Sequence, residues 1–302
     1  MAMALSYFGT NFTQEQTAVF LKPNAEDRNV TPEEMAAYVN EETGLQAIAR
    51  ANGNADTVRR LLAADVPVIL HMGIDPPGDF SWMGWYGHYL LVVAYDDDLE
   101  QLWVYDSWFG TSEEPLQNAS AEGRVLPYAE LDERWVQFNH NYIPTYRPDQ
   151  AQAVAAIIGD DMDDDAMWAQ ALQRVQADTQ ADPDDAFHWF NLGTIYTAME
   201  QYDEAVLAYD QARAIGLPWR MLWYQFGPYE AYYENGRYED VIFLADTTLK
   251  DRPYFEESFY YRGIAHAAMG NTAQARRDLE DAIEFNPNHA LAVTALAEID
   301  NG

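Results

Sequence analysis

The stretch WFNLGTIYTAMEQYDEAVLAYDQA, residues 189–212, recurs further along the chain with a period near 34 residues. Small residues return at matching places, with Ala205, Val241 and Ala275 spaced 36 and 34 residues apart. A repeat of this length is one supersecondary unit that cannot bury its apolar face alone, so neighbouring copies stack into a solenoid. The second half of the chain is therefore predicted to be an all-α array of helix pairs.

The quoted stretch also has the spacing W-x2-L-G-x2-Y, followed by a small residue and an aromatic residue. The residues in these slots are Trp189, Leu192, Gly193, Tyr196, Ala205, Tyr209 and Ala212. Residues from about 185 to 287 thus resemble three tetratricopeptide repeats. Residues 165–179 resemble a leading half-repeat, and residues 290–300 resemble the trailing helix that caps a solenoid.

This resemblance implies a concave face lined by the inner helices. Six aromatic side chains occupy its inner-helix slots: Phe187, Phe190, Trp223, Phe226, Tyr233 and Tyr260. Several exposed aromatic side chains in one groove are typical of a docking site. We expect this groove to bind a protein or peptide ligand, or else to dock the N-terminal domain.

The chain is strongly acidic, with 17 Lys and Arg against 50 Asp and Glu and a net charge of −33 over 302 residues. Nucleic acids and anionic membranes need a basic face, so the composition argues against both as partners. No apolar run reaches the roughly 18 residues of a membrane span, and the first residues lack the pattern of a signal peptide. The sequence as given predicts a soluble chain. Its location stays open, including an extracytoplasmic one if a signal segment precedes residue 1.

The first half has a mixed α and β pattern. Thr31-Pro32-Glu33-Glu34 combines an N-cap, a proline at the first helical position and an acidic first turn, which predicts a helix to about residue 42. A second short helix is predicted at 56–63. Apolar, β-branched and aromatic runs predict strands at 66–71, 88–95, 101–106 and 135–146. We therefore expect an α+β domain at 1–148 and the helical repeats at 149–302.

A histidine and an aspartate lie at the open ends of one predicted hairpin. If Tyr95 pairs with Leu99 across a three-residue turn, His88 stands directly opposite Asp106, close enough for a carboxylate to orient the imidazole. A register shifted by one residue would instead place Ser107 opposite His88. Both strands are apolar on both faces, so the pattern leaves the two registers open.

The surrounding segments, GWYGHYLLVVAYDD at 84–97 and YDSWFG at 105–110, resemble the His and Asp motifs of papain-like cysteine peptidases related to bacteriocin-processing (double-glycine leader) peptidases. The resemblance covers roughly residues 1–146 and implies a papain-like α+β fold. It implies that His88 is the general base and that Asp106 orients it. Trp82, Trp85 and Tyr86 precede His88 and are candidates for the wall of a substrate cleft; packing of the loop explains them equally well.

The sequence departs from this family at its start. Residues 1–7 match the end of the helix that begins with the family's Cys-Gly-Pro motif, and the chain contains no cysteine. A base without a nucleophile does not catalyse acyl transfer, so the chain as given is expected to act by binding. Two alternatives stay open: an active cysteine peptidase whose cysteine lies upstream of residue 1, and a pure repeat scaffold. An in-frame Cys-Gly-Pro upstream would favour the peptidase.

No cofactor or metal site is indicated. The acidic run at 160–165 lacks the glycine and the distant glutamate of a calcium-binding EF-hand loop, and carboxylates before a helix favour the helix dipole. The remaining histidines have no metal-ligand spacing and are interpreted as structural: His71, His140, His188, His266 and His289.

Overall fold

The computed structural model describes residues 1–24, 26–27, 29–76, 81, 83–106 and 123–301. These residues form two compact units. The first unit comprises residues 1–17 and 31–181, and the second comprises 18–30 and 182–302. The chain therefore passes between the units after Thr17, after Val30 and after Ala181.

A six-stranded antiparallel sheet forms the centre of the first unit, in the order β1-β6-β2-β3-β4-β5. The strands are β1 (Gln46–Ala47), β2 (Val68–Ile74), β3 (Tyr86–Asp96), β4 (Gln101–Asp106), β5 (Arg124–Pro127) and β6 (Tyr142–Tyr146). The helices of this unit are α1 (Ala2–Tyr7), α3 (Pro32–Glu42), α4 (Ala55–Ala63), α5 (Tyr128–Trp135), α6 (Ala151–Ile158) and α7 (Asp164–Ala181). Helix α2 (Gln14–Leu21) begins in the first unit and ends in the second. Short 3-10 helices lie at Val136–Phe138, Pro148–Gln150 and Gly159–Met162. The expected α+β architecture is confirmed.

The main core of this unit lies on one face of the sheet. Alternate strand residues such as Leu70, Leu90 and Val104 pack there against apolar side chains of helices α4, α5 and α6. On the other face, side chains of helix α1 and the cross-strand pair Leu91 and Tyr105 line a common cavity. The sheet is therefore covered on both faces.

The predicted helix after Thr31 forms as expected. The Thr31 hydroxyl accepts a hydrogen bond from the Glu34 amide, and the Glu34 carboxylate accepts one from the Thr31 amide at 2.8 Å. This reciprocal capping box satisfies two amides at the start of α3. The predicted strand 135–146 is wrong in its first half, where α5 and a 3-10 helix end in left-handed residues Asn139 and His140 before β6 begins.

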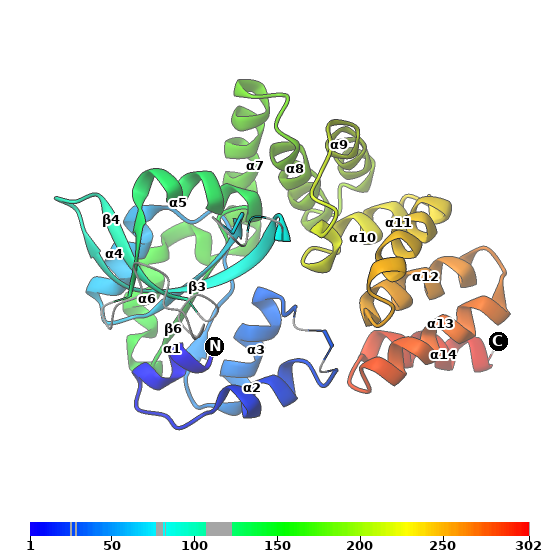
Figure 1. Cartoon of the computed structure of the whole chain (residues 1–302), viewed down its shortest axis with the longest axis horizontal. Coiled ribbons are helices and arrows are strands. Elements are labelled where there is room, and N and C mark those ends of the chain that lie inside the picture. The colour runs from blue at the N-terminus through cyan, green and yellow to red at the C-terminus, as the bar shows by residue number, and fades with distance from the viewer. Residues whose placement is uncertain (25, 28, 77–80, 82, 107–122, 302) are drawn as a thin grey trace. The chain divides into compact units, whose positions relative to one another are not determined.

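The second unit consists of paired helices that follow one another in chain order (Figure 1). The pairs are α8 (Ala186–Ala198) with α9 (Tyr202–Ile215), α10 (Gly227–Glu234) with α11 (Tyr238–Asp251), and α12 (Glu256–Ala268) with α13 (Thr272–Phe285), followed by α14 (Ala290–Asn301). Gly193 permits the close approach of α8 and α9, because a side chain there would overlap the Tyr209 ring, whose nearest atom is 2.6 Å from the ideal Cβ position. The all-helical repeat architecture is confirmed.

The middle pair departs from the regular repeat. Helix α10 has 8 residues where α8 and α12 have 13 each, and a short 3-10 helix at Met221–Trp223 precedes it. The spacing from Ala205 to Val241 is two residues longer than that from Val241 to Ala275, and the connection between α9 and α10 lies within this longer stretch. Residues 216–226 thus form a loop where the regular pattern predicts the start of an inner helix.

The units also divide at a different place from the boundary expected near Pro148. Helix α6 contributes to the core of the sheet, and Arg174 of α7 donates hydrogen bonds to the carbonyls of Asn52 and Gly53. Both helices therefore belong to the first unit, which extends to Ala181. The sequence pattern alone does not separate a helix of the repeat array from a helix that packs on a neighbouring core.

Candidate functional site

His88 and Asp106 lie on the core face of the sheet, near the ends of neighbouring strands. His88 pairs with Met72 of β2, and Asp106 pairs with Leu90, two residues after His88. Met72 and Leu90 both belong to the core cluster, so the side chains of His88 and Asp106 emerge at its edge. The His88 side chain is 12% exposed and that of Asp106 is 2% exposed.

The two side chains are hydrogen bonded, with 2.8 Å between Nε2 of His88 and Oδ1 of Asp106. Their contact is diagonal rather than directly cross-strand, so both expected registers are wrong. The turn contains four residues after Asp96, and Val93 forms a bulge that shifts the pairing. Diagonal neighbours on one face of an antiparallel pair are still within reach of long side chains.

Arg124 is a third member of the site that the sequence did not indicate. Its Nη2 lies 3.2 Å from Oδ2 of Asp106, so the two oxygens of one carboxylate contact two different side chains. Arg124, the first residue of β5, pairs with Val104 of β4, which makes Arg124 a second diagonal neighbour of Asp106. The sequence could have indicated this contact only if the short strand Arg124–Pro127 had been predicted, since its pairing with β4 brings Arg124 to Asp106.

Aromatic side chains pack close to the site. His71 is stacked between Tyr89 and Phe138, with ring centroids 4.1 and 3.6 Å away. Burial, and secondarily the proximity of His88, hold the pKa of His71 well below its ordinary value. This residue is therefore neutral at physiological pH, in keeping with its interpretation as structural.

The expected cleft wall is only partly described. Trp85 is 8% exposed, stacks on Phe138 and donates a hydrogen bond of 2.6 Å to Gln137 Oε1. Tyr86 is half-buried and packs against the core, and Trp82 lies outside the described residues. Trp85 is thus a packed residue rather than an exposed wall.

The six aromatic residues of the expected groove are less exposed than predicted. Phe190 is 1% exposed, and its ring meets that of Tyr209 at 5.1 Å. Trp223 is 6% exposed and packs on Phe255 in the loop that replaces the start of the inner helix. These two side chains belong to the core, because the repeat slots that they fill face the neighbouring helix. Phe187, Phe226, Tyr233 and Tyr260 are half-buried.

The negative charge of acidic side chains acts on two of these half-buried rings. Burial raises the pKa of Tyr260, and the adjacent Tyr233, Glu230, Glu234 and Glu298 raise it further. We call these five residues the Tyr260 surface. It combines aromatic rings with carboxylates contributed by helices α10, α12 and α14.

The acidic run at 160–165 is explained by local structure. The Asp163 carboxylate accepts a hydrogen bond from the amide of Ala166 at the start of α7. Asp164 forms an ion pair of 2.6 Å with Arg50, and Asp161 accepts a hydrogen bond of 3.1 Å from Asn52. These contacts cap a helix and attach it to the sheet.

One group of carboxylates with the geometry of a metal site occurs among the described residues: Asp27, Glu256 and Glu257, in the second unit. Lys22 contacts all three, with its Nζ 3.0 Å from Asp27, 3.0 Å from Glu256 and 2.7 Å from Glu257. The ammonium group is therefore the cation that this cluster holds. We call these four residues the Lys22 cluster.

Comparisons with known proteins agree with the architecture. Residues 1–143 match the Peptidase_C39 like family, and residues 189–212 and 256–289 each match a tetratricopeptide repeat. The chain carries a Peptidase_C39-like domain followed by tetratricopeptide repeats. The resemblance stated from the His and Asp motifs and from the repeat slots is thereby confirmed. The middle helix pair, with its short α10, lies between the two matched repeats.

Curated relatives match only part of the chain. Aryl-hydrocarbon-interacting protein-like 1 of Bos taurus is 26% identical over 113 residues, which is 34% of this chain and 34% of that protein. Tetratricopeptide repeat protein 16 of Macaca fascicularis is 24% identical over 136 residues, which is 42% of this chain and 16% of that protein. The matches thus span about a third or less of these relatives.

Two solved tetratricopeptide structures are also similar to part of the chain. The first repeat domain of Spaghetti (RPAP3), solved with the HSP90 peptide SRMEEVD, is 21% identical, with a TM-score of 0.35 over 40% of this chain and 94% of that one. YrrB, described as having an unusual peptide-binding site, is 20% identical, with a TM-score of 0.24 over 42% of this chain and 82% of that one. Among the described helices, none has the length and apolar character of a membrane span.

Proposed function

We propose that this protein acts by binding a peptide or protein, with the Peptidase_C39-like domain used for recognition rather than for hydrolysis. The observation that carries the proposal is the combination of an intact His88–Asp106 pair with a sequence of 302 residues that contains no cysteine. Acyl transfer in a cysteine peptidase needs the thiolate, and an oriented imidazole does not replace it.

The repeat domain supports binding, because stacked helix pairs create extended concave surfaces. On the Tyr260 surface, in addition to burial, Glu230, Glu234 and Glu298 raise the pKa of Tyr260, and Glu234 and Glu298 also raise the pKa of Tyr233. Carboxylates around half-buried aromatic rings favour a basic partner, since the charge steers association and the rings supply contact area. The partner of this surface is therefore proposed to be a lysine- or arginine-rich segment.

Binding is tested by fluorescence polarisation of a labelled lysine-rich peptide with the full chain. The double variant Glu230→Gln/Glu234→Gln is expected to weaken binding several-fold at low salt and to reduce its salt dependence. The matched control Glu41→Gln/Glu42→Gln removes the same charge from exposed positions of α3 and is expected to bind like the wild type. Equal weakening by both variants would attribute binding to net charge alone and contradict the proposed surface.

A second candidate is an active cysteine peptidase whose nucleophile is outside the printed residues. The contact of 2.8 Å between His88 and Asp106 favours it, because Asp106 holds Nε2 and thereby assigns proton transfer to Nδ1. Reading the DNA upstream of residue 1 tests this candidate, because it requires an in-frame Cys-Gly-Pro there. Hydrolysis of casein and of a fluorogenic peptide library by the 302-residue chain tests the binding proposal. The binding proposal expects no hydrolysis. Hydrolysis that iodoacetamide leaves intact and His88→Ala abolishes would overturn it.

A further inference from the structure

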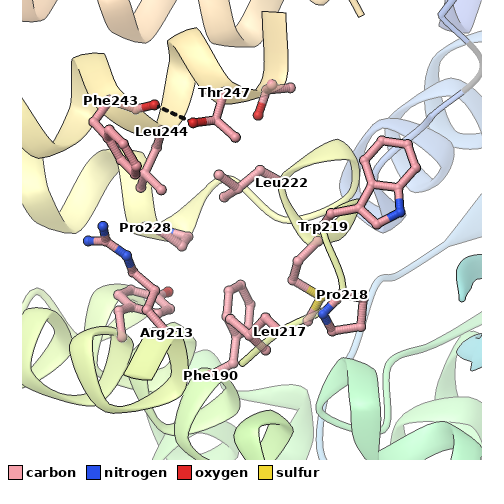
Figure 2. Close-up of a pocket in the computed structure, with 13 residues that line it drawn as sticks. Phe190, Arg213, Leu217, Pro218, Trp219, Leu222, Pro228, Phe243, Leu244 and Thr247 are labelled. Atoms are coloured by element: carbon pink, nitrogen blue, oxygen red, sulfur yellow. Dashed lines mark hydrogen bonds between the residues drawn. The ribbon is translucent and has the colours of Figure 1, made fainter. Parts of the chain in front are cut away.

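The loop that shortens helix α10 also builds a cavity elsewhere in the second unit. It has a volume of about 160 Å³ and lies between helices α9 and α11 and residues 217–222. Figure 2 shows Phe190, Leu222, Pro228 and Leu244 arranged around a common space. We call it the α9–α11 pocket. Residues of the Tyr260 surface do not line it.

Three of the polar side chains that line the pocket are already engaged. Arg213 Nη1 donates to Asp240 at 3.2 Å and to Tyr232 at 3.1 Å. Thr247 donates to the Phe243 carbonyl at 2.8 Å, and the Thr248 hydroxyl accepts from Tyr229 at 3.2 Å (Figure 2 for Thr247). An occupant would therefore gain carbon contacts rather than hydrogen bonds, which selects an apolar group.

The size of the pocket and the exposure of the residues at its edge further restrict which chemical group can bind there. An apolar cavity of roughly 150 Å³ holds a benzene ring, so one phenyl group matches the available volume. Trp219 and Phe243 line the pocket and are 55% and 59% exposed. Large exposed aromatics at an open cavity are typical of sites where a partner inserts an anchor side chain.

The flanking helices supply a charge preference. Helices α9 and α11 carry seven acidic and two basic residues. Three of the acidic residues are paired, Asp210 and Asp240 with Arg213 and Arg237, and Asp246 with Arg262. The other four carboxylates, Asp203, Glu204, Glu239 and Asp251, are exposed, as is Lys250, so the two helices stay acidic at their surface. A basic segment is complementary to this surface, whereas an acidic one is repelled.

From the cavity and its flanks together, we propose that the α9–α11 pocket binds the phenyl ring of a phenylalanine in a basic peptide segment. This site is separate from the Tyr260 surface and adds an aromatic requirement that net charge does not explain. It arises from the irregular loop at residues 216–226, so a regular repeat would not contain it.

The test measures binding of three peptides to the full chain: Lys-Lys-Phe-Lys-Lys, Lys-Lys-Ala-Lys-Lys and Glu-Glu-Phe-Glu-Glu, each capped at both ends. The first is expected to bind about tenfold or more tightly than the second, as burial of a phenyl ring requires, and far more tightly than the third. Equal affinity of the phenylalanine and alanine peptides would overturn the proposal, and so would equal affinity of the basic and acidic phenylalanine peptides.

Variants of pocket residues test whether the phenylalanine binds in the α9–α11 pocket. Thr247→Trp fills the opening and Phe243→Ala removes part of the wall, so each is expected to reduce the phenylalanine-over-alanine preference at least about fivefold. Leu207→Ala is the matched control, since Leu207 is 68% exposed on α9 and does not line the pocket; it should leave the preference unchanged. Thermal unfolding of each variant checks that the fold is retained.

A preference that survives both pocket variants would overturn this assignment. If it instead disappears in Tyr260→Ala, the phenylalanine is bound at the Tyr260 surface, and the proposed function stands without the pocket. Lysine-rich peptides could instead fail to bind at the Tyr260 surface while Thr247→Trp abolishes the phenylalanine-over-alanine preference. That result would support the α9–α11 pocket and contradict the proposed role of the Tyr260 surface.

Discussion

A nearly buried ionic cluster can be compared in each unit of this protein, around Asp106 in the first and around Lys22 in the second, and the two are built in opposite ways. In the first unit, one carboxylate, Asp106, contacts two basic side chains. In the second unit, one ammonium group, Lys22, contacts three carboxylates. Removal of the central group therefore leaves unpaired basic side chains in one case and unpaired buried carboxylates in the other. The second loss is more costly, because Asp27, Glu256 and Lys22 are all nearly inaccessible to water.

The largest expected effect follows from loss of the Lys22 ammonium group. Lys22→Met leaves Asp27, Glu256 and Glu257 without their shared cation and is expected to lower the free energy of unfolding by about 3–5 kcal/mol. Lys250→Met is the matched control, because Lys250 is the other lysine of the chain and is exposed. Urea unfolding measures both. An equal effect of the two substitutions would contradict a structural role for the cluster.

A smaller loss is expected at Asp106. Asp106→Asn keeps the shape of the side chain but removes the charge that holds Arg124 and His88, which is expected to cost about 2 kcal/mol. Arg124 and His88 are 24% and 12% exposed, so water compensates part of the loss. The matched control Asp97→Asn removes a carboxylate that contacts Arg59 and Tyr128 at the surface. The comparison fails if the control destabilises the protein as much as Asp106→Asn.

The Lys22 cluster also predicts a pH dependence. Burial, opposed by Lys22, raises the pKa of Glu257 to about 8 and that of Asp27 to about 6. Both carboxyls bind protons more tightly in the folded state than in the unfolded state, so their contribution to stability is present at low pH and is lost as the pH rises through these values.

The melting temperature of the second unit is therefore expected to fall between about pH 5 and pH 9. Within the cluster, Glu256 accepts hydrogen bonds from both Lys22 and Asn286. The matched comparison is Glu257→Gln, which removes the carboxyl with the higher pKa and should flatten the upper part of this slope. A slope that is identical in wild type and variant would show that Glu257 does not titrate in this range.

The smallest effect on stability is expected for His88→Ala. The imidazole lies at the edge of the core, and its removal leaves the ion pair between Arg124 and Asp106 in place, so the free energy of unfolding should change by less than about 1 kcal/mol. Peptide binding measured beside unfolding then distinguishes a recognition role from a spacer role for this domain. A pure scaffold predicts that His88→Ala leaves binding unchanged.

The contrast between the two clusters also explains what the sequence could predict. His88 and Asp106 belong to one hairpin and lie 18 residues apart, so local pattern placed them together despite the wrong register. The register was wrong because of the bulge at Val93 and the four-residue turn, and neither can be predicted from strands that are apolar on both faces. Arg124 was missed because its strand of four residues carries too short a pattern. Lys22 and Glu256 are 234 residues apart, and no periodicity links them.

The repeat domain shows the same limit. Small and large residues in the repeat slots predicted helix pairs, because those slots describe packing between adjacent elements. The slots did not predict that Phe190 and Trp223 face inward, since a residue type does not reveal which neighbour covers it. Likewise, the longer spacing between Ala205 and Val241 did not predict the shortened α10 and the pocket beside it.

The threefold passage of the chain between its units limits how the two could be separated or exchanged. A fragment that begins at residue 182 would carry Glu256 and Glu257 without their lysine, and a fragment that ends at 181 would carry Lys22 without helix α12. Recombination at a single junction would therefore produce two incomplete products. A functional swap of the repeat array must also transplant residues 18–30, so the two halves are expected to be inherited together.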